Sequence, residues 1–274
     1  MTRYLVVPQW QGSPSTRAMQ LIDGAHAIAG DLPRSATTIL DVPIEAGESL
    51  GTGIRRLSTL QRVRAQVEEA LSSSQEGPVL TIGGDCGVAL GPIAHAVARH
   101  PDLAVVWIDA HPDFNTPETS PSGAFAGMVL RAVVGDGDPA LVLAEGAVAP
   151  DRVVLAATRS YDDAELEAIE ERGIRVVSSD ALRDANALAA AVAATGAGSV
   201  YIHVDVDALD PAELAGNAHP EPFGVRVADL TAAIGAVRAA VPLVGATLAG
   251  YSPASPDAAT DDLGALLRIV GALA

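Results

Sequence analysis

Two apolar segments of the sequence each end in acidic residues spaced two apart. These residues are Asp109, His111 and Asp113 in the first segment and Asp205 and Asp207 in the second. Side chains of an extended chain alternate between two faces, so each set projects to one side if the extension continues past the strand end. Five oxygen and nitrogen ligands at two strand ends predict a site for a pair of divalent cations.

The charge of this set supports two ions. Unpaired carboxylates gathered at buried strand ends repel one another and cost several kcal/mol through desolvation, so cations are needed to balance them. Mostly oxygen ligands with one imidazole favour Mn²⁺ over Zn²⁺. The alternative for any single aspartate at a strand end is a helix N-cap.

Alternating apolar and amphipathic stretches predict the elements that position these residues. Strands are expected at residues 4–8, 37–42, 79–82, 104–109, 153–158, 174–178, from 200 into the second acidic motif, and at 243–249. Helices are expected at about residues 16–29, 54–72, from 88, 124–134, 163–172, 186–194, 227–239 and 260–273. The loops over 115–123 and 212–224 are long enough to be functional.

This alternation predicts one α/β domain over residues 1–274, because no linker long enough to divide it is present. A doubly wound, mostly parallel sheet is the first interpretation, and an eight-stranded barrel is the alternative. In both architectures the carboxyl ends of the strands share one face. Cys86 and both acidic motifs therefore lie on that face.

The composition excludes several classes of partner. The formal net charge of −17 argues against nucleic acid and anionic membranes. The single cysteine, Cys86, excludes an internal disulfide and favours a reducing compartment, so we expect a cytoplasmic protein. No stretch has the roughly 18 to 20 apolar residues that a membrane span needs, and no signal peptide is evident.

Three motifs carry a resemblance to a known family. The segments 83–86 (GGDC), 109–117 (DAHPDFNTP) and 203–211 (HVDVDALDP) resemble the signature motifs of the ureohydrolase family of arginases and agmatinases. The resemblance implies a three-layer α/β/α sandwich with an eight-stranded sheet and two Mn²⁺ ions. It also implies hydrolysis of a guanidino group to a urea and an amine, by water that the metals have made more acidic.

The resemblance also implies how the ligands are shared between the ions. Two aspartates would bridge both ions, and two further residues would complete each one. The bridging pair is Asp109 and Asp205, one ion is completed by Asp113 and Cys86, and the other by His111 and Asp207. Asp113 is also a candidate catalytic residue.

The substrate residues implied by the resemblance lie in two later segments. Asn115 and Ser122 match residues that hold an α-carboxylate, and Asp162 with Glu165 matches the pair that receives an α-amino group. The alternatives are that Ser122 only shapes its turn and that Asp162 only caps the following helix. His219 is a candidate proton shuttle, and its alternative is a solvated loop histidine.

Four positions depart from the family pattern. Cys86 replaces a histidine ligand, Ala126 the proton-shuttling histidine, Ala124 an asparagine that seats the amino-acid end, and Gly250 the glutamate that grips the guanidinium. A thiolate at Cys86 adds negative charge and weakens the Lewis acidity of its ion, whereas an inert buried thiol is the alternative. These losses penalise ordinary arginine, because positioned groups normally orient its guanidinium and protonate its leaving amine.

A less basic guanidine would suffer less from these losses. The exchange of cysteine for histidine resembles family members of antibiotic biosynthesis that hydrolyse Nω-hydroxy-L-arginine to hydroxyurea and L-ornithine, and this is the leading hypothesis. The alternatives are a general arginase- or agmatinase-type enzyme and a non-catalytic metal-binding relative. We expect a small guanidino amino acid as the partner, and a monomer in preference to a homotrimer.

Overall fold

The computed structural model describes residues 2–72 and 77–274. Its strands form one sheet of eight in the order β2-β1-β3-β8-β7-β4-β5-β6, and every pair is parallel. The strands are β1 (Arg3–Val7), β2 (Thr37–Ile39), β3 (Val79–Gly83), β4 (Leu103–Ile108), β5 (Val153–Ala156), β6 (Arg175–Val177), β7 (Ser199–Asp205) and β8 (Leu243–Ala249). In the described residues β2 and β6 are open edges, so the barrel alternative is wrong.

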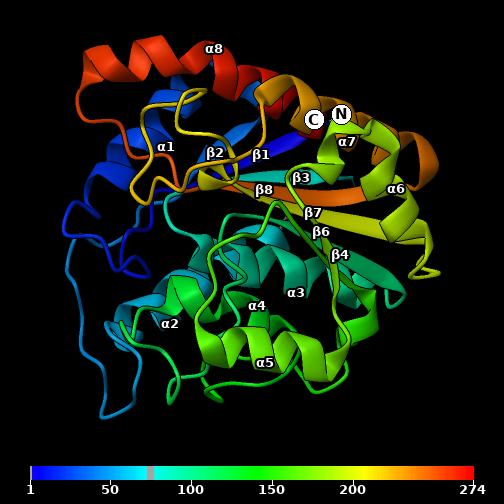
Figure 1. Ribbon diagram of the computed structural model, residues 1–274. Coiled ribbons are helices and arrows are strands. Elements are labelled where there is room, and N and C mark those ends of the chain that lie inside the picture. The colour runs from blue at the N-terminus through cyan, green and yellow to red at the C-terminus, as the bar shows by residue number, and fades with distance from the viewer. Residues whose placement is uncertain (1, 73–76) are drawn as a thin grey trace.

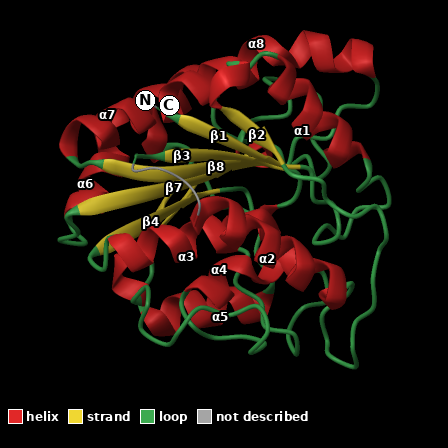
Figure 2. Ribbon diagram, turned by 180° about the vertical axis from the view of Figure 1, so that it is seen from behind, coloured by secondary structure: helices red, strands yellow, loops and turns green. Residues whose placement is uncertain are grey.

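Helices cover both faces of the sheet, as Figures 1 and 2 show. They are α1 (Gln20–Gly30), α2 (Leu57–Ser72), α3 (Leu90–Arg99), α4 (Val129–Val133), α5 (Asp163–Arg172), α6 (Ala185–Ala193), α7 (Val227–Ala240) and α8 (Pro256–Leu273). One layer contains α1, α6, α7 and α8, and the other contains α2 to α5. The predicted three-layer α/β/α sandwich is therefore confirmed.

The burial of each strand follows from these two layers. All six residues of β4 are buried, because its alternate side chains enter the two opposite cores. The stripe predicted for α2 is also buried, with Leu57, Leu60, Val63, Val67 and Leu71 at 1–2% exposure. Both ends of the chain meet at the sheet, where the Thr2 hydroxyl donates to the Ala274 carbonyl at 3.0 Å. The expected single domain over 1–274 stays a prediction.

Most predicted elements are present, with boundary shifts of a few residues. The expected helix over 124–134 is an exception, because it consists of a 3-10 turn (Phe125–Met128) followed by the short α4. The second strand is also shorter than predicted and ends at Ile39. Among the described residues, no helix combines the length and apolarity needed to cross a membrane.

Candidate metal centre and substrate site

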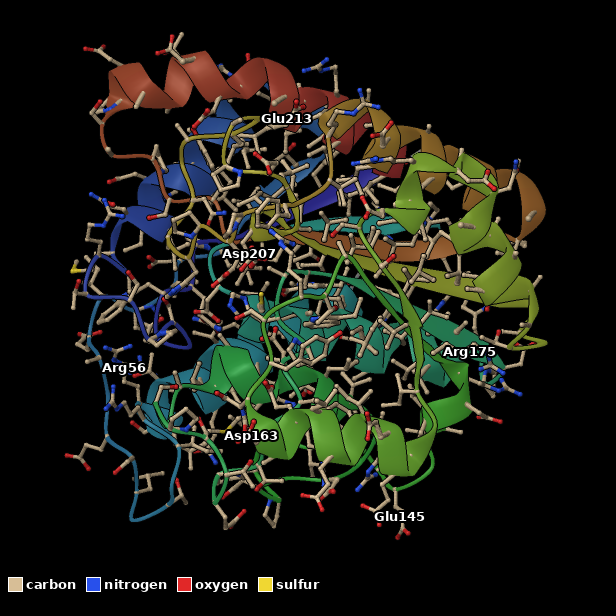
Figure 3. The ribbon with its side chains drawn as sticks, in the orientation of Figure 1. Arg56, Glu145, Asp163, Arg175, Asp207 and Glu213 are labelled. Carbon is tan, nitrogen blue, oxygen red and sulfur yellow. The ribbon has the colours of Figure 1, made fainter. Side chains whose placement is uncertain are left out.

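The ends of three strands bring the predicted ligands together. Cys86 follows β3, Asp109 follows β4 and Asp205 ends β7. All six predicted metal ligands and all four predicted substrate residues line one cavity of about 150 Å³, together with His219. Figure 3 shows Asp207 between the helix layers, above the start of α5, where Asp163 is labelled. A wider cavity of about 1000 Å³, which Glu221 helps to line, contains none of these residues.

The loop that presents Cys86 is held by a neighbouring aspartate. The Asp85 carboxylate accepts hydrogen bonds from Gln9 Nε2 at 2.9 Å, and from the backbone N–H groups of Gly12 and Gly87, both at 2.8 Å. Burial raises the pKa of Asp85 to about 6, against the opposing effect of these donors. Asp85, for which the sequence predicted no role, positions the turn between β3 and the 3-10 turn that opens at Cys86.

The ligand atoms fall into two close pairs. Cys86 Sγ lies 2.8 Å from Asp205 Oδ2 and 3.7 Å from Asp109 Oδ2. His111 Nδ1 lies 2.9 Å from Asp207 Oδ2 and 3.6 Å from Asp109 Oδ1. Asp109 therefore lies between the thiol on one side and the imidazole on the other.

The backbone that produces this arrangement differs from the one expected. β4 ends at Ile108, and Asp113 has a left-handed backbone with φ +51°, so the extended chain does not continue to residue 113. Asp207 likewise lies in a 3-10 turn, where its N–H donates to Asp205 Oδ1 at 2.8 Å. Convergence by simple alternation is thus wrong, and tight turns bring the side chains to the same cavity.

The electrostatics of the cluster fit the binding of cations. Burial raises the pKa of Asp205 to about 7 and that of Asp207 to about 6, and nearby carboxylates add to both effects. The pKa of Asp113 is raised well above its ordinary value for the same two reasons. Asp113 Oδ2 is buried and has no hydrogen-bond partner among residues 2–72 and 77–274. Divalent cations would remove both penalties, so these residues suit a metal site.

His111 partly compensates the acidic groups. Burial would lower its pKa, but hydrogen bonds to Asp109 and Asp207 outweigh that effect and raise the pKa to about 12. The protonated His111 ring therefore carries a proton on the nitrogen that a metal ion would occupy, because metal binding requires the neutral imidazole.

A second histidine, not predicted as a ligand from the sequence, lies in the cluster. His203 lies on β7 and is completely buried, with its ring stacked on Trp107 at a centroid distance of 3.6 Å. One ligand atom each from Cys86, Asp109 and His203 lie within 4.8 Å of one another. The signal was present, because His203 precedes Asp205 by two residues on the same face of a strand.

The four predicted substrate residues form a polar wall of the cavity that the predicted metal ligands also line. Asn115 Nδ2 donates to Asp162 Oδ2 at 2.8 Å, and Asn115 Oδ1 accepts from Thr119 Oγ1 at 2.8 Å. Ser122 Oγ accepts from the backbone N–H of Ala124 at 3.1 Å, so it also shapes its turn. Asp162 is the residue before α5, so it occupies the N-cap position as well as lining the cavity.

Glu165 has a different role in the wall. It is 4% exposed, and its two carboxylate oxygens accept the backbone N–H groups of Phe114 at 2.8 Å and Asp162 at 3.0 Å. Both oxygens are therefore used to join the loop after β4 to the start of α5. The structure favours a positioning role for Glu165, and a direct contact with substrate stays a prediction.

Ala126 occupies the position at which the family pattern has a proton-shuttling histidine. Ala126 lines the cavity but has no group that exchanges protons. His219 lines it as well, with its ring perpendicular to that of His111 at 6.3 Å. His219 Nε2 is buried without a partner in the described part of the chain, and burial lowers the pKa of its ring.

Gly250 leaves no room for a side chain. Its φ is +84°, and a Cβ added to it would lie 2.1 Å from Asp205 Oδ1. The family's glutamate could therefore not be carried by this backbone without moving Asp205, so the departure is built into the local structure.

An open parallel sheet with a buried cluster of carboxylates, imidazole and thiol at its carboxyl edge is typical of metal-dependent hydrolases. Comparison with known proteins narrows this class. The Arginase family profile matches residues 16–270. An arginase of Bacillus caldovelox is 35% identical over 195 residues, which cover 66% of this chain and 65% of that protein. An N(omega)-hydroxy-L-arginine amidinohydrolase of Streptomyces lavendulae is 35% identical over 211 residues, covering 74% of this chain and 72% of that protein.

The solved structures agree on the fold. Entamoeba histolytica arginase, crystallised with L-ornithine, superposes with a TM-score of 0.86 at 23% identity, covering 99% of this chain and 97% of that one. The chain belongs to the arginase family, a metal-dependent family of hydrolases that includes amidinohydrolases. The predicted resemblance is therefore confirmed.

Proposed function

We propose that this protein hydrolyses the guanidino group of an arginine-like amino acid, with Nω-hydroxy-L-arginine as its best substrate. Water adds to the guanidino carbon, the bond from that carbon to the side-chain nitrogen breaks, and the products are hydroxyurea and L-ornithine. The observation that carries the proposal is the single cavity that joins the cation ligands to a polar wall suited to an amino acid.

Two Mn²⁺ ions are the proposed cofactor. Asp109 and Asp205 would be shared, with Cys86 and Asp113 on one side and His111 and Asp207 on the other, as the family pattern implies. The contacts of Cys86 with Asp205 and of His111 with Asp207 support this division. The metals would supply a water made acidic enough to react at neutral pH.

The polar wall would bind the amino-acid end of the substrate. Asp162 offers a carboxylate to an α-amino group, and its contact with Asn115 holds it in place. Asn115 and Ser122 would hold the α-carboxylate. Agmatine has no carboxylate and would leave these two residues unused, so an α-amino acid is favoured.

His219 is the proposed proton shuttle. Partial burial lowers the pKa of the His219 ring and so favours its neutral form, which can take a proton during attack and return it to the departing amine. Its free Nε2 inside the cavity supports this role. Asp113, with one buried unpartnered oxygen, is the proposed catalytic carboxylate.

Nω-hydroxy-L-arginine is preferred because the groups that serve ordinary arginine are missing at Ala126 and Gly250. A hydroxyl on the guanidine withdraws electrons and lowers its basicity, so less positioning is needed. The second candidate substrate is L-arginine, which the 35% identity to a Bacillus caldovelox arginase favours.

Turnover of three substrates by the Mn²⁺-loaded protein tests the proposal. Nω-hydroxy-L-arginine, L-arginine and agmatine are compared by measuring ornithine or putrescine release. We expect the highest kcat/KM for Nω-hydroxy-L-arginine. Equal values for the two amino acids would support a general arginase instead, and no turnover of any substrate would support a non-catalytic relative. Light scattering of the same sample tests the proposed monomer.

A pair of neighbouring variants tests the substrate wall. Asp162→Asn removes the charge that would meet the α-amino group, and a charged hydrogen bond contributes about 1.5–3 kcal/mol, so KM should rise about 10- to 100-fold. Asp163→Asn, at the exposed first position of α5, is the matched control. An equal KM in both variants would exclude Asp162 from substrate binding.

A further inference from the structure

The neighbours of His203 in the sheet set the direction of its side chain. In the sheet register His203 pairs with Trp107 of β4 and with Thr247 of β8. Trp107, two residues before Asp109, packs in the core between the sheet and the layer of α2 to α5. Because alternate residues of a strand share a face, His203 and Asp205 point toward the same layer.

The imidazole of His203 has no hydrogen-bond partner. The residue is 0% exposed, and neither Nδ1 nor Nε2 finds a donor or acceptor among residues 2–72 and 77–274. A neutral imidazole has one donor and one acceptor nitrogen, and leaving such groups buried and unpaired costs about 1–3 kcal/mol each. Stacking on Trp107 uses the face of the ring and satisfies neither nitrogen.

The ring lies where a bound cation could satisfy one of its unpaired nitrogens. A nitrogen of His203, the sulfur of Cys86 and a carboxylate oxygen of Asp109 lie within 4.8 Å of one another. Ligands around one divalent ion lie about 2.0–2.3 Å from it, so two of them are separated by at most about 4.6 Å. A small adjustment of these three side chains would therefore allow them to surround one cation.

We propose that His203 is a metal ligand, giving one imidazole nitrogen to the divalent cation at Cys86 and Asp109. The imidazole comes from β7, which β8 separates in the sheet from β3, the strand that leads to Cys86. The second ring nitrogen remains available to the thiol or to a buried water. This inference rests on the proposed binding of metal in the cavity, and it adds a seventh ligand to the six deduced from the sequence.

Binding of Mn²⁺ by the full chain tests the proposal without a turnover assay. Pulsed EPR of protein with ¹⁵N-labelled histidine, loaded with Mn²⁺, counts the imidazoles bound to the metals. We expect two couplings in the wild type, from His111 and His203, and one in His203→Leu and His203→Gln. Calorimetric titration should show one site weakened by at least about 10-fold in both variants. His95→Gln, on α3 and outside the site, is the control.

Thermal unfolding shows whether the variants are folded. His203→Leu removes an unpaired buried group, so the metal-free variant should melt at or above the wild-type temperature, while its stabilisation by Mn²⁺ should shrink. A single imidazole coupling in the wild type would overturn the proposal even without a variant, and so would unchanged couplings in either variant. A wild type that binds no Mn²⁺ would instead defeat the proposed function.

Discussion

Gly250 offers the sharpest test of how the site is built. Replacing it with alanine places a Cβ at φ +84°, 2.1 Å from Asp205 Oδ1. A left-handed backbone costs an ordinary residue about 1–2 kcal/mol. Nonbonded carbon contacts are normally about 3.5 Å, so the Asp205 carboxylate must move by about 1 Å or more.

That displacement has a predictable size of effect. Asp205 is proposed to touch both metals, and a misplacement of about 1 Å in a reacting group can cost about 100-fold in rate. We therefore expect Gly250→Ala to lose about 10- to 100-fold in Mn²⁺ affinity, and at least about 100-fold in kcat/KM. Gly250→Glu, which restores the family's residue, should lose as much and gain no activity on L-arginine.

Calorimetric Mn²⁺ titration and ornithine release measure these effects. The matched control is Gly196→Ala, which has a similar φ of +69° but nothing within 4 Å of the added Cβ. The control should lose about 1–2 kcal/mol of stability and keep its metal affinity. Wild-type metal affinity in Gly250→Ala, or a gain of arginine hydrolysis in Gly250→Glu, would show that Asp205 is not fixed as described.

Three further changes probe the same site. Glu165→Gln should lose about 1–3 kcal/mol of unfolding free energy and raise KM, because the side-chain amide cannot accept both backbone N–H groups. Urea denaturation and steady-state kinetics measure these effects. An unchanged KM would count against the positioning of Asp162 by Glu165. The metal-free protein should lose stability as the pH rises from about 4 to 7. Its folded state holds protons on Asp205 and Asp207, whereas the unfolded chain releases them near its ordinary carboxyl pKa of 3.8, and stabilisation by Mn²⁺ should instead grow with pH. Melting temperatures measured with EDTA or with Mn²⁺ at each pH check both trends, and flat profiles would refute them. Asp113→Asn should raise the melting temperature of the metal-free protein, because burial and neighbouring carboxylates penalise the Asp113 carboxylate. It should also abolish turnover, because the proposed catalytic carboxylate is lost. A lower melting temperature would contradict this.

The sequence predicted elements best where local chemistry marks both ends. α5 begins and ends as expected, because Asp162 precedes it and Gly173 follows with a left-handed φ of 64°. The helix expected over 124–134 failed because tertiary contacts compete there. The Ala126 N–H donates to Gly12, and the N–H groups of Leu130 and Arg131 donate to Asp113. These contacts hold the segment against the site in place of a regular helix.

The site was predicted in part for a similar reason. The spacing of the acidic motifs identified residues that line the cavity, but it could not show the turns that bring Asp113 and Asp207 there. His203 was missed because its relation to Cys86 is tertiary and spans 117 residues of sequence. A histidine inside an apolar strand is ordinarily a packing residue. The spacing of two between His203 and Asp205 places them on one face, and the position of the thiol shows which group His203 meets there.

The departures from the family pattern are better described as relocation than as loss. The chain lacks a histidine at positions 86 and 126. Two other histidines, the buried His203 and the half-buried His219, have buried ring nitrogens without a partner within the described structure, the first beside Cys86 and Asp109 and the second in the cavity wall. A protein without catalytic use would gain stability by replacing such groups with apolar ones, because each costs free energy while unpaired. Retaining them beside four buried carboxylates is intelligible if metals and substrate satisfy them, which favours an active hydrolase over a non-catalytic relative.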